Sequence, residues 1–478
     1  MSADAMRPLI VDMDGTLIKT DMLFESCLRA IKQSPWVVFL LPFWLLRGRA
    51  VLKARLAAMG NIDVAVLPFY EDVLSFLREQ KQRGRTIVLA TASTSELADR
   101  VANEVGLFDD VMASHAGLNL KSRAKAAALV DRYGEQGFDY VGNDSADFAV
   151  WRVAHTAHVV NASEGFARRA RALAVEAGEW FLAKPVSLLT LLRALRVHQW
   201  VKNVLVFVPL LMAHRFHEPQ LFIKAALAYV AFCLCASSVY LLNDMMDLDD
   251  DRHHRSKKNR PIAAGSFPII AALLLFPALF LVGFGMAVFL VSLPFALLLG
   301  LYYLLTLAYS FSLKRLLMVD VVVLAGLYTS RIAGGALAID VDLSFWLITF
   351  SVFIFLSLAL VKRYAELIVL KGSGAAEIKG RGYSVEDLPT LLSLGTASAY
   401  LSVLVMALYI DTQKVAELYR QPQFLWLLCP VMLYWVSRVW MLTHRGQMHD
   451  DPIVFAIKDT VSRYTAACMA LILVLASW

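Results

Sequence analysis

The C-terminal three-fifths of the chain, from about residue 185 to residue 478, is dominated by apolar stretches. These stretches are close to the roughly 20 residues that an α-helix needs to cross a bilayer. The residues before this point alternate apolar and polar runs, as soluble α/β domains do. The hydrophobic content of 58% is high for a soluble protein, and the C-terminal part accounts for the excess. The sequence therefore predicts a soluble domain followed by an all-α polytopic membrane bundle.

We expect about nine membrane spans, the first of them weak. They lie near 203–214, 221–242, 267–289, 291–310, 318–338, 343–361, 392–410, 424–441 and 464–478. The loops at 243–266, 311–317, 362–391 and 442–463 are rich in Lys and Arg, whereas the opposite loops carry Arg215, Lys414 and Arg420. The positive-inside rule then places the N-terminal domain in the cytoplasm of a multi-pass inner-membrane protein. No cleaved signal peptide is expected, and the five cysteines show no metal-binding spacing.

Strands alternate with helices over residues 1–165, which predicts a mostly parallel sheet. A short apolar run from Pro8 enters DMDGT, a second buried strand covers 86–90, and FDYVG and HTAHVVNA supply two more. Residues 21–68 are expected to form a helical cap and residues 166–185 a helical linker. The apolar run 35–46 is too short to span a bilayer, so it is either a buried cap helix or a helix in the membrane interface.

Two carboxylates follow the first predicted strand. Asp12 and Asp14 are two residues apart, so on an extended segment their side chains point the same way and can meet one ligand. Phosphoryl transfer to a carboxylate needs a nucleophile, a proton source and a cation that gathers phosphate oxygens. The pair therefore indicates phosphate chemistry.

The DMDGT motif resembles the signature of the haloacid dehalogenase superfamily of phosphatases. The resemblance implies that Asp12 is the nucleophile and Asp14 the general acid/base. It also implies that Thr91 holds the phosphoryl group and that Lys125 offsets its charge, with Lys121 as a competing lysine for this role.

The GNDSAD segment carries the expected magnesium ligands of that superfamily, with one departure. Asp147 matches the second magnesium carboxylate, but Asn143 stands where an aspartate is usual, and Asp144 is the adjacent acid. The implied Mg²⁺ ligands are Asp12, Asp14, Asn143 and Asp147. Loss of one formal charge should weaken cation binding, so a retained fold with little catalysis is the alternative.

A second acidic motif runs from Asn243 to Pro261, where an apolar span meets the cytoplasmic side. One asparagine and three aspartates follow the three- and four-residue steps of one helix face: Asn243, Asp244, Asp247 and Asp251. Cations follow at once: Arg252, His254, Lys257 and Arg260. Carboxylates recruit Mg²⁺ and the cations can bind the phosphates that the metal bridges. A solvated helix end is the plain alternative.

This motif resembles NDxxDxxxDxxxxxxKxxRP, the first signature of the UbiA superfamily of intramembrane polyprenyl transferases. The resemblance covers residues 186–478. It implies a helical bundle that opens to lipid and that performs Mg²⁺-dependent catalysis under a cytoplasmic cap.

The second acidic signature of most UbiA proteins is altered here. LVKRYAEL supplies Lys362, Arg363 and Glu366, a composition suited to direct phosphate binding. A further acidic set on the last cytoplasmic loop comprises Asp450, Asp451 and Asp459. This combination is similar to the decaprenyl-phosphate phosphoribosyltransferase branch, as are HQWVKN, AYSFSLKR and VDVVVLAGLYTSRIAGG. The implied phosphate-binding residues in these phrases include Lys202, Tyr309 and Lys314.

The sequence thus predicts a bifunctional membrane enzyme. The membrane domain would transfer 5-phosphoribose from phosphoribosyl pyrophosphate to a polyprenyl phosphate, and the soluble domain would remove the 5-phosphate. The alternative is transfer of a prenyl chain from its pyrophosphate to an aromatic or other acceptor, and a transporter or lipid-binding scaffold is a third hypothesis. Arg331, inside a span, needs an anionic partner, for which Asp320 and a ligand phosphate are both open. No nucleic-acid partner is expected, and the oligomeric state is left open.

Overall fold

The computed structural model describes residues 7–60, 62–115, 119–182, 185–372, 381–448 and 451–478. The chain forms two compact units, and each is described by itself. Unit 1 comprises residues 1–195 and 240–276, and unit 2 comprises residues 196–239 and 277–478. The acidic segment Asn243–Pro261 therefore belongs to the same unit as the soluble domain.

Unit 1 is built on a six-stranded parallel sheet with the order β3-β2-β1-β4-β5-β6. The strands are β1 Leu9–Val11, β2 Ile87–Thr94, β3 Asp110–Ser114, β4 Asp139–Gly142, β5 Thr156–Ala162 and β6 Glu176–Leu182. Side chains of β1 alternate between the two faces: Leu9 and Val11 enter one core and Ile10 the other. Both faces are covered by helices, as parallel sheets require.

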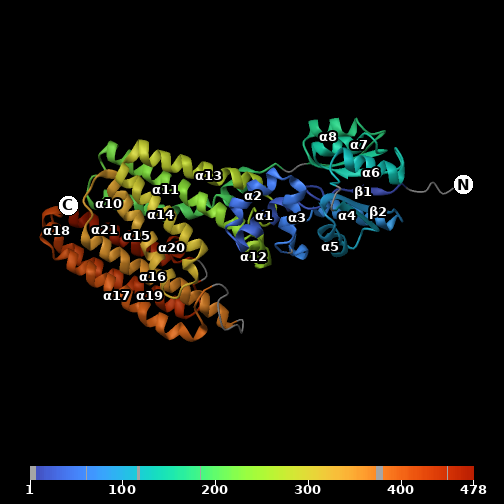
Figure 1. Ribbon diagram of the computed structural model, residues 1–478. Coiled ribbons are helices and arrows are strands. Elements are labelled where there is room, and N and C mark those ends of the chain that lie inside the picture. The colour runs from blue at the N-terminus through green and yellow to red at the C-terminus, as the bar shows by residue number, and fades with distance from the viewer. Residues whose placement is uncertain (1–6, 61, 116–118, 183–184, 373–380, 449–450) are drawn as a thin grey trace. The chain divides into compact units, whose positions relative to one another are not determined.

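The helices of the soluble domain follow the strands in chain order. They are α4 Glu71–Gln82, α5 Ser95–Val105, α6 Arg123–Tyr133, α7 Phe148–Trp151 and α8 Glu164–Arg171, with the 3₁₀ turn η2 Ser145–Asp147. Helices α4 and α5 pack on one face of the sheet, and α6, α7 and α8 on the other (Figure 1). The predicted α/β domain with a parallel sheet is confirmed.

The expected helical linker over 166–185 is a wrong prediction within its described residues. Helix α8 packs on β5 there, and β6 then extends the sheet beyond β5. The reason is that β6 is an edge strand with mixed exposure, so its sequence EAGEWFL lacks the alternation of a half-buried strand. Residues 183–184 lie outside the described part. The first compact unit accordingly runs on to Leu195 and includes helix α9, Leu188–Ala194.

The cap between β1 and β2 is helical, as predicted. It contains α1 Met22–Gln33, α2 Val37–Leu46, α3 Arg49–Ala57 and the 3₁₀ turn η1 Val64–Val66. Asp21 caps α1 by accepting a hydrogen bond from the Leu23 N–H. Unit 1 also contains α12 Leu248–His253 and η4 Lys257–Asn259 from the acidic segment.

The C-terminal part of the chain is helical. Its elements are η3 Val197–Phe207, α10 Val208–Met212, α11 Pro219–Met246, α13 Ile269–Met286, the π-turn η5 Ala287–Val291, α14 Leu293–Phe311, η6 Leu313–Arg315, α15 Val319–Ile339, α16 Phe345–Gly372, η7 Val385–Asp387, α17 Leu388–Ile410, α18 Gln413–Leu418, η8 Pro422–Leu427, α19 Leu428–His444, α20 Pro452–Lys458 and α21 Thr460–Ser477. Within the described residues, eight helical segments are long and apolar enough to cross a membrane. The expected weak span at 203–214 lies in η3 and α10, which form a shorter apolar segment.

Candidate active sites

The first site lies at the carboxyl end of β1, where parallel sheets bind their ligands. The Asp12 carboxylate accepts a hydrogen bond of 2.6 Å from the Lys125 ammonium, which α6 provides. Lys121 is exposed, so Lys125 is the lysine at this site. Burial raises the pKa of Asp12 to about 7 even though Lys125 opposes the shift. A second cation next to Asp12, in addition to the Lys125 ammonium, would therefore favour the ionised, nucleophilic form of Asp12.

Asp14 is held by two donors. The backbone N–H of Met22 and the hydroxyl of Ser93 each donate to its carboxylate over 3.0 Å. Burial raises the pKa of Asp14 to about 6, which suits a general acid working near neutral pH. Thr91, on β2, is buried and its hydroxyl accepts the Ser93 N–H, so the expected phosphoryl-binding residue lies two positions before the Asp14 partner.

Asn143 approaches the DMDGT loop closely. Its side-chain oxygen accepts a hydrogen bond of 3.1 Å from the Thr16 hydroxyl. Gly15 has a φ of +73°, and a Cβ there would lie 2.3 Å from the Asn143 side-chain nitrogen. Glycine is therefore required for this contact, which places Asn143 beside the Asp14 loop.

Asp147 has a different environment from Asp12, Asp14 and Asn143. One of its oxygens accepts from the N–H groups of Asn143 and Asp144, and the other accepts from the Tyr140 hydroxyl. Tyr140 in turn accepts from Lys125 over 3.0 Å. Asp147 thus shapes the loop and helps to orient Lys125.

The donor set fits Mg²⁺. Asp12, Asp14 and Asn143 offer hard oxygen ligands, and Mg²⁺ binds through one or two carboxylates while it keeps waters or substrate oxygens. Among the described residues, no three His, Cys, Asp or Glu side chains are placed to hold a metal ion by themselves.

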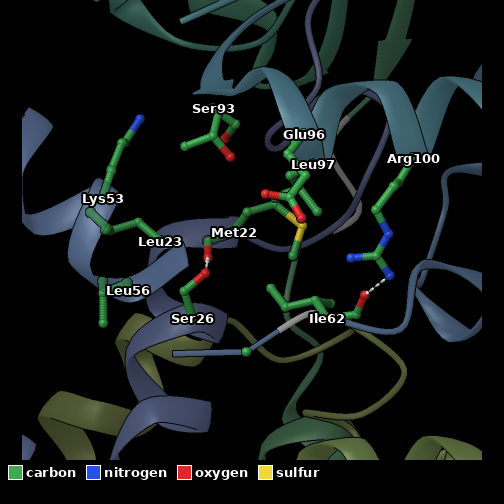
Figure 2. Close-up of a pocket in the computed structure, with 12 residues that line it drawn as sticks. Met22, Leu23, Ser26, Lys53, Leu56, Ile62, Ser93, Glu96, Leu97 and Arg100 are labelled. Carbon is green, nitrogen blue, oxygen red and sulfur yellow. Dashed lines mark hydrogen bonds between the residues drawn. The ribbon is translucent and has the colours of Figure 1, made fainter. Parts of the chain in front are cut away.

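A pocket opens beside this site, between the cap and the sheet domain (Figure 2). Its cap wall is formed by Met22, Leu23, Ser26 and Leu56, and Lys53 lies at its edge. Its opposite wall comes from the end of β2 and from α5, and includes Ser93, Glu96, Leu97 and Arg100. Because Met22 and Ser93 both donate to Asp14, the pocket leads to the expected catalytic acid.

The second site begins where α11 ends. Asp247 interrupts the helix, but the N–H of Asp247 bonds to the Asn243 carbonyl and the N–H of Asp251 to the Asp247 carbonyl, so the helical steps continue. One Arg260 nitrogen donates to Asp244 over 3.1 Å and to Asp251 over 2.5 Å. Burial raises the pKa of Asp251. Asp244 and Asp251 therefore both bind the Arg260 guanidinium. Their carboxylate oxygens are also ligands of the kind that Mg²⁺ prefers.

The remaining residues of the motif have unequal roles. Arg252 is buried and donates through two nitrogens to both oxygens of Glu25 on α1, over 2.7 and 2.8 Å. Its third nitrogen donates to the Ala263 carbonyl. This geometry favours a docking role for Arg252 over the expected phosphate binding. His254 and Lys257 are exposed and stay available as predicted phosphate ligands.

A second set of contacts reinforces the docking of α1 on α12. Arg29 pairs with Asp249 at 2.9 Å and Lys32 with Asp250 at 2.8 Å. The acidic motif is therefore attached directly to the phosphatase-like cap.

In unit 2, Asp451 gathers two of the expected phosphate-binding lysines. Lys202 lies 2.8 Å and Lys362 lies 3.3 Å from the same carboxylate oxygen. Burial alone would raise the pKa of Asp451, but the two lysines outweigh it and hold the pKa at about 2. Asp451 thus brings together Lys202, which lies 249 residues before it in the sequence, and Lys362, which lies 89 residues before it, in one cationic group. Of the other expected acids, Asp459 pairs with Arg438, and Asp450 lies outside the described residues.

Arg363 is fully buried, unlike its neighbour Lys362. It donates to Asp320 over 2.6 Å, to Glu366 over 2.6 Å and to the Tyr309 hydroxyl over 3.1 Å. Asp320 also accepts from Tyr383 over 2.5 Å. These contacts indicate that Arg363, Tyr309 and Glu366 hold α14, α15 and α16 together. Lys314 lies in η6, between α14 and α15.

Arg331 does not pair with Asp320, which corrects one of the two partners expected for it. It donates to the Asn203 side chain over 2.8 Å, to the Tyr302 hydroxyl over 3.0 Å and to the Leu327 carbonyl. It also lies over the Tyr302 and Tyr328 rings, at 5.1 and 5.2 Å from their centroids. All these partners are neutral, so a ligand phosphate remains the open alternative.

Comparison with known proteins settles the family. Residues 204–461, more than half of the chain, match the model of the UbiA prenyltransferase family. The chain belongs to the UbiA prenyltransferase family. Residues 9–152 match the model of haloacid dehalogenase-like hydrolases. The protein is therefore a UbiA-family membrane protein with an N-terminal haloacid dehalogenase-like domain, as both motifs predicted.

Relatives share this organisation to different extents. An uncharacterised protein, y4nM of Sinorhizobium fredii, is 38% identical over 475 residues, which cover 99% of this chain and 92% of that protein. The decaprenyl-phosphate phosphoribosyltransferase of Corynebacterium glutamicum is 36% identical over 189 residues, or 39% of this chain and 57% of that enzyme. A solved UbiA homologue from Archaeoglobus fulgidus bound to GPP and Mg²⁺ is 15% identical, with a TM-score of 0.45, and covers 59% of this chain and 99% of its own.

Several residues at the sites of this UbiA-family protein escaped sequence analysis. Ser93 donates to Asp14, Tyr140 accepts from Lys125, and Glu25 binds the acidic motif. Ser93 follows Thr91 by two residues, so its proximity to the site could have been inferred. Glu25 lies 227 residues from its partner, and no local pattern indicates the contact.

Proposed function

We propose that this protein transfers 5-phosphoribose from phosphoribosyl pyrophosphate to a polyprenyl phosphate, and that its N-terminal domain then removes the 5-phosphate. In the first reaction a phosphate oxygen of the lipid attacks the anomeric carbon, and the bond from that carbon to pyrophosphate breaks. In the second, the phosphomonoester is hydrolysed to an alcohol and inorganic phosphate. The likeness to decaprenyl-phosphate phosphoribosyltransferases supports the choice of substrates.

The donor belongs at the acidic motif in this proposal. Asp244, Asp247 and Asp251 would hold Mg²⁺, which when bound neutralises charge on the pyrophosphate leaving group. Lys257 and His254 are exposed beside them and would bind phosphate oxygens directly. Arg260 keeps Asp244 and Asp251 close together.

The lipid phosphate belongs with the cations of unit 2. Lys202 and Lys362 share one carboxylate, Asp451, so this group of three has a formal charge of +1. An acidic pair at this position would repel a phosphate, whereas two lysines attract it. Arg331, held by neutral partners, is a further candidate for this phosphate.

The phosphatase step uses the soluble domain's own residues. Asp12 attacks phosphorus to form an aspartyl phosphate, and the alcohol leaves with a proton from Asp14. Water then hydrolyses the aspartyl phosphate, with Asp14 as the base. Lys125 offsets charge on the phosphoryl group. Asp12, Asp14 and Asn143 would hold Mg²⁺, which would supply further positive charge to stabilise the phosphoryl group.

The observation that carries the bifunctional proposal is the attachment of the acidic motif to the phosphatase cap. The buried Arg252–Glu25 pair joins α12 to α1, and α1 begins at Met22, whose N–H donates to Asp14. The acidic motif and the phosphatase-like site therefore share one compact unit, which supports action of the two sites on successive forms of one substrate. We place this unit on the cytoplasmic side of an inner membrane, in line with the loop charges.

The transfer step has a direct test. The purified full chain is incubated with Mg²⁺, polyprenyl phosphate and phosphoribosyl pyrophosphate labelled in the ribose. We expect label in the lipid fraction and a loss of at least about 100-fold in Asp244→Asn. The matched control is Asp131→Asn, an exposed aspartate on α6. Absence of lipid-linked label with the unaltered chain would refute the transfer step.

Prenyl transfer from a prenyl pyrophosphate is the second candidate, favoured by the family as a whole. Prenyl transfer needs acidic side chains near Lys362, so the Lys362→Asp variant distinguishes the two candidate functions. Increased prenyl transfer in this variant would support the second candidate, and loss of lipid-linked pentose without any prenyl transfer would support the first.

A further inference from the structure

Helix α2 of the cap is apolar on every side and is nevertheless exposed. Its ten residues, VVFLLPFWLL, include no charged side chain. Seven large apolar side chains between residues 36 and 46 are 44–85% exposed: Trp36, Val38, Phe39, Leu40, Phe43, Leu45 and Leu46. A helix that is apolar all round is normally buried in protein or lipid. This exposed apolar surface therefore requires an occupant.

The inner side of α2 is fixed to the cap. Val37 is buried against Ala30 of α1 and against Leu52 and Leu56 of α3, and Leu41 and Trp44 pack on the same cluster. Gly48, with a φ of +109°, reverses the chain between α2 and α3. Since Leu46 is 85% exposed at this reversal, the helical hairpin has an apolar tip.

The position of α2 along the chain indicates what covers it. Helix α1, which precedes α2, is attached through Arg29 and Lys32 to Asp249 and Asp250 of α12. Helix α11 is a membrane span that ends at Met246, and α12 begins two residues later. Lys32 lies four residues before Trp36. The apolar helix thus starts close to the place where the chain leaves the bilayer.

Charge and length also favour a lipid occupant. Arg47 directly follows α2 and is exposed, as is Arg55 on α3, and both can reach anionic lipid headgroups. Ten residues of helix are about 15 Å long. This length is half of the roughly 30 Å hydrocarbon core, so α2 cannot cross the bilayer and fits within one leaflet.

We propose that α2 inserts into the lipid leaflet on its own side of the membrane and anchors the phosphatase cap there. This inference concerns the cap alone and does not depend on which reactions the protein catalyses. It brings the pocket of Figure 2 to the bilayer surface, because Leu23 and Leu56 of that pocket belong to the cluster beneath α2. A phosphomonoester carried by a membrane lipid could then reach Asp14 without leaving the bilayer.

Spin-label accessibility in the full chain tests the proposal. The background carries Cys27→Ser, Cys429→Ser and Cys468→Ser, and retains Cys233 and Cys235, which are fully buried. One label is placed at Phe39→Cys and a second at Phe43→Cys, one turn later. The control label is placed at Ser75→Cys, an exposed position on α4. The samples are nanodiscs that contain anionic phospholipid, and the unlabelled background corrects for residual labelling.

The expected result is collision with oxygen at both α2 positions, little collision with a water-soluble nickel chelate, and the reverse at Ser75. Strong collision with the nickel chelate at both α2 positions would place the helix in water and overturn the proposal. Weak collision with both reagents would show that protein covers α2, from this chain or another copy, and would also overturn it. Two labelled positions keep the test decisive if one substitution disturbs the hairpin.

Discussion

Arg252 and Glu25 form an ion pair in which both side chains are 2% exposed. Two charges removed from water to this degree are stable together because each satisfies the other with two hydrogen bonds. Thr20 donates to Glu25 as well. Neither residue can lose its partner without leaving a buried charge unpaired, so the pair fixes the contact between the cap and the acidic motif.

This pair has a testable energetic signature. Arg252→Leu or Glu25→Leu alone should lower the stability of the contact by about 3–5 kcal/mol, because each leaves an unpaired buried charge. The double variant should recover much of this loss, since two apolar side chains of similar volume need no partner. Thermal unfolding of the full chain in detergent measures all three variants. A double variant that is as destabilised as the sum of the two single variants would contradict this account.

Adjacent cations in α16 differ in a similar way. Arg363 is 0% exposed and bonded to Asp320, Glu366 and Tyr309, whereas the Lys362 side chain is 36% exposed and shares Asp451 with Lys202. The first therefore stabilises the bundle, and the second is available to a ligand.

Matched substitutions separate these two roles. Arg363→Lys should lower the melting temperature, because an ammonium cannot reproduce three hydrogen bonds from a planar guanidinium. Lys362→Gln should leave the melting temperature within about 1 °C, since Asp451 keeps its ion pair with Lys202, and it should weaken binding of polyprenyl phosphate. Melting and lipid-binding curves of both variants provide the measurement. Unchanged lipid binding in Lys362→Gln would rule out its proposed role.

At the scale of elements, β6 is joined to β5 by a titratable contact. The His158 Nδ1 atom accepts a hydrogen bond of 2.9 Å from the Glu179 N–H, so Nδ1 must be unprotonated. Burial lowers the pKa of His158 to about 4. In the unfolded chain the same side chain has a pKa of about 6.5.

The stability of the soluble domain should consequently fall in acid. Below pH 6.5, His158 takes up a proton in the unfolded chain, whereas in the folded protein it is protonated only near pH 4. The contribution is fully present above pH 6.5 and is lost as the pH falls from 6.5 to 4, by about 3 kcal/mol in total. His158→Asn keeps an acceptor but does not titrate, so the melting temperature of this variant should vary less with pH across this range. Equal slopes for both proteins would exclude His158 as the cause.

Sequence patterns predicted the central elements better than the peripheral ones. Strands β1 and β2 and the long spans were predictable because burial imposes continuous apolar runs. Strand β6 was not, because an edge strand with mixed exposure carries no such pattern. Helix α2 left two interpretations open, since its sequence fits both a protein core and a membrane interface, and its exposure now favours the second.

At the scale of the whole molecule, motifs identified both families but not the contacts of their residues. DMDGT predicted that Asp12 and Asp14 follow the first strand, because a short apolar run leads directly into the motif. The partners of Arg252, Arg363 and Lys202 come from segments 43 to 249 residues away. Local spacing carries no information about such pairs, so their roles as ion-pair partners emerged from the structure.

The central claim is that one chain makes a lipid-linked phosphopentose and dephosphorylates it. Mass spectrometry of the lipid product, made from phosphoribosyl pyrophosphate and polyprenyl phosphate with Mg²⁺, tests this claim most directly. The full chain should yield the lipid without a 5-phosphate and release inorganic phosphate. Asp12→Asn should accumulate the 5-phosphorylated lipid at an undiminished transfer rate, whereas Asp131→Asn, an exposed control, should behave like the full chain. An identical product distribution for Asp12→Asn and the unaltered chain would contradict the account.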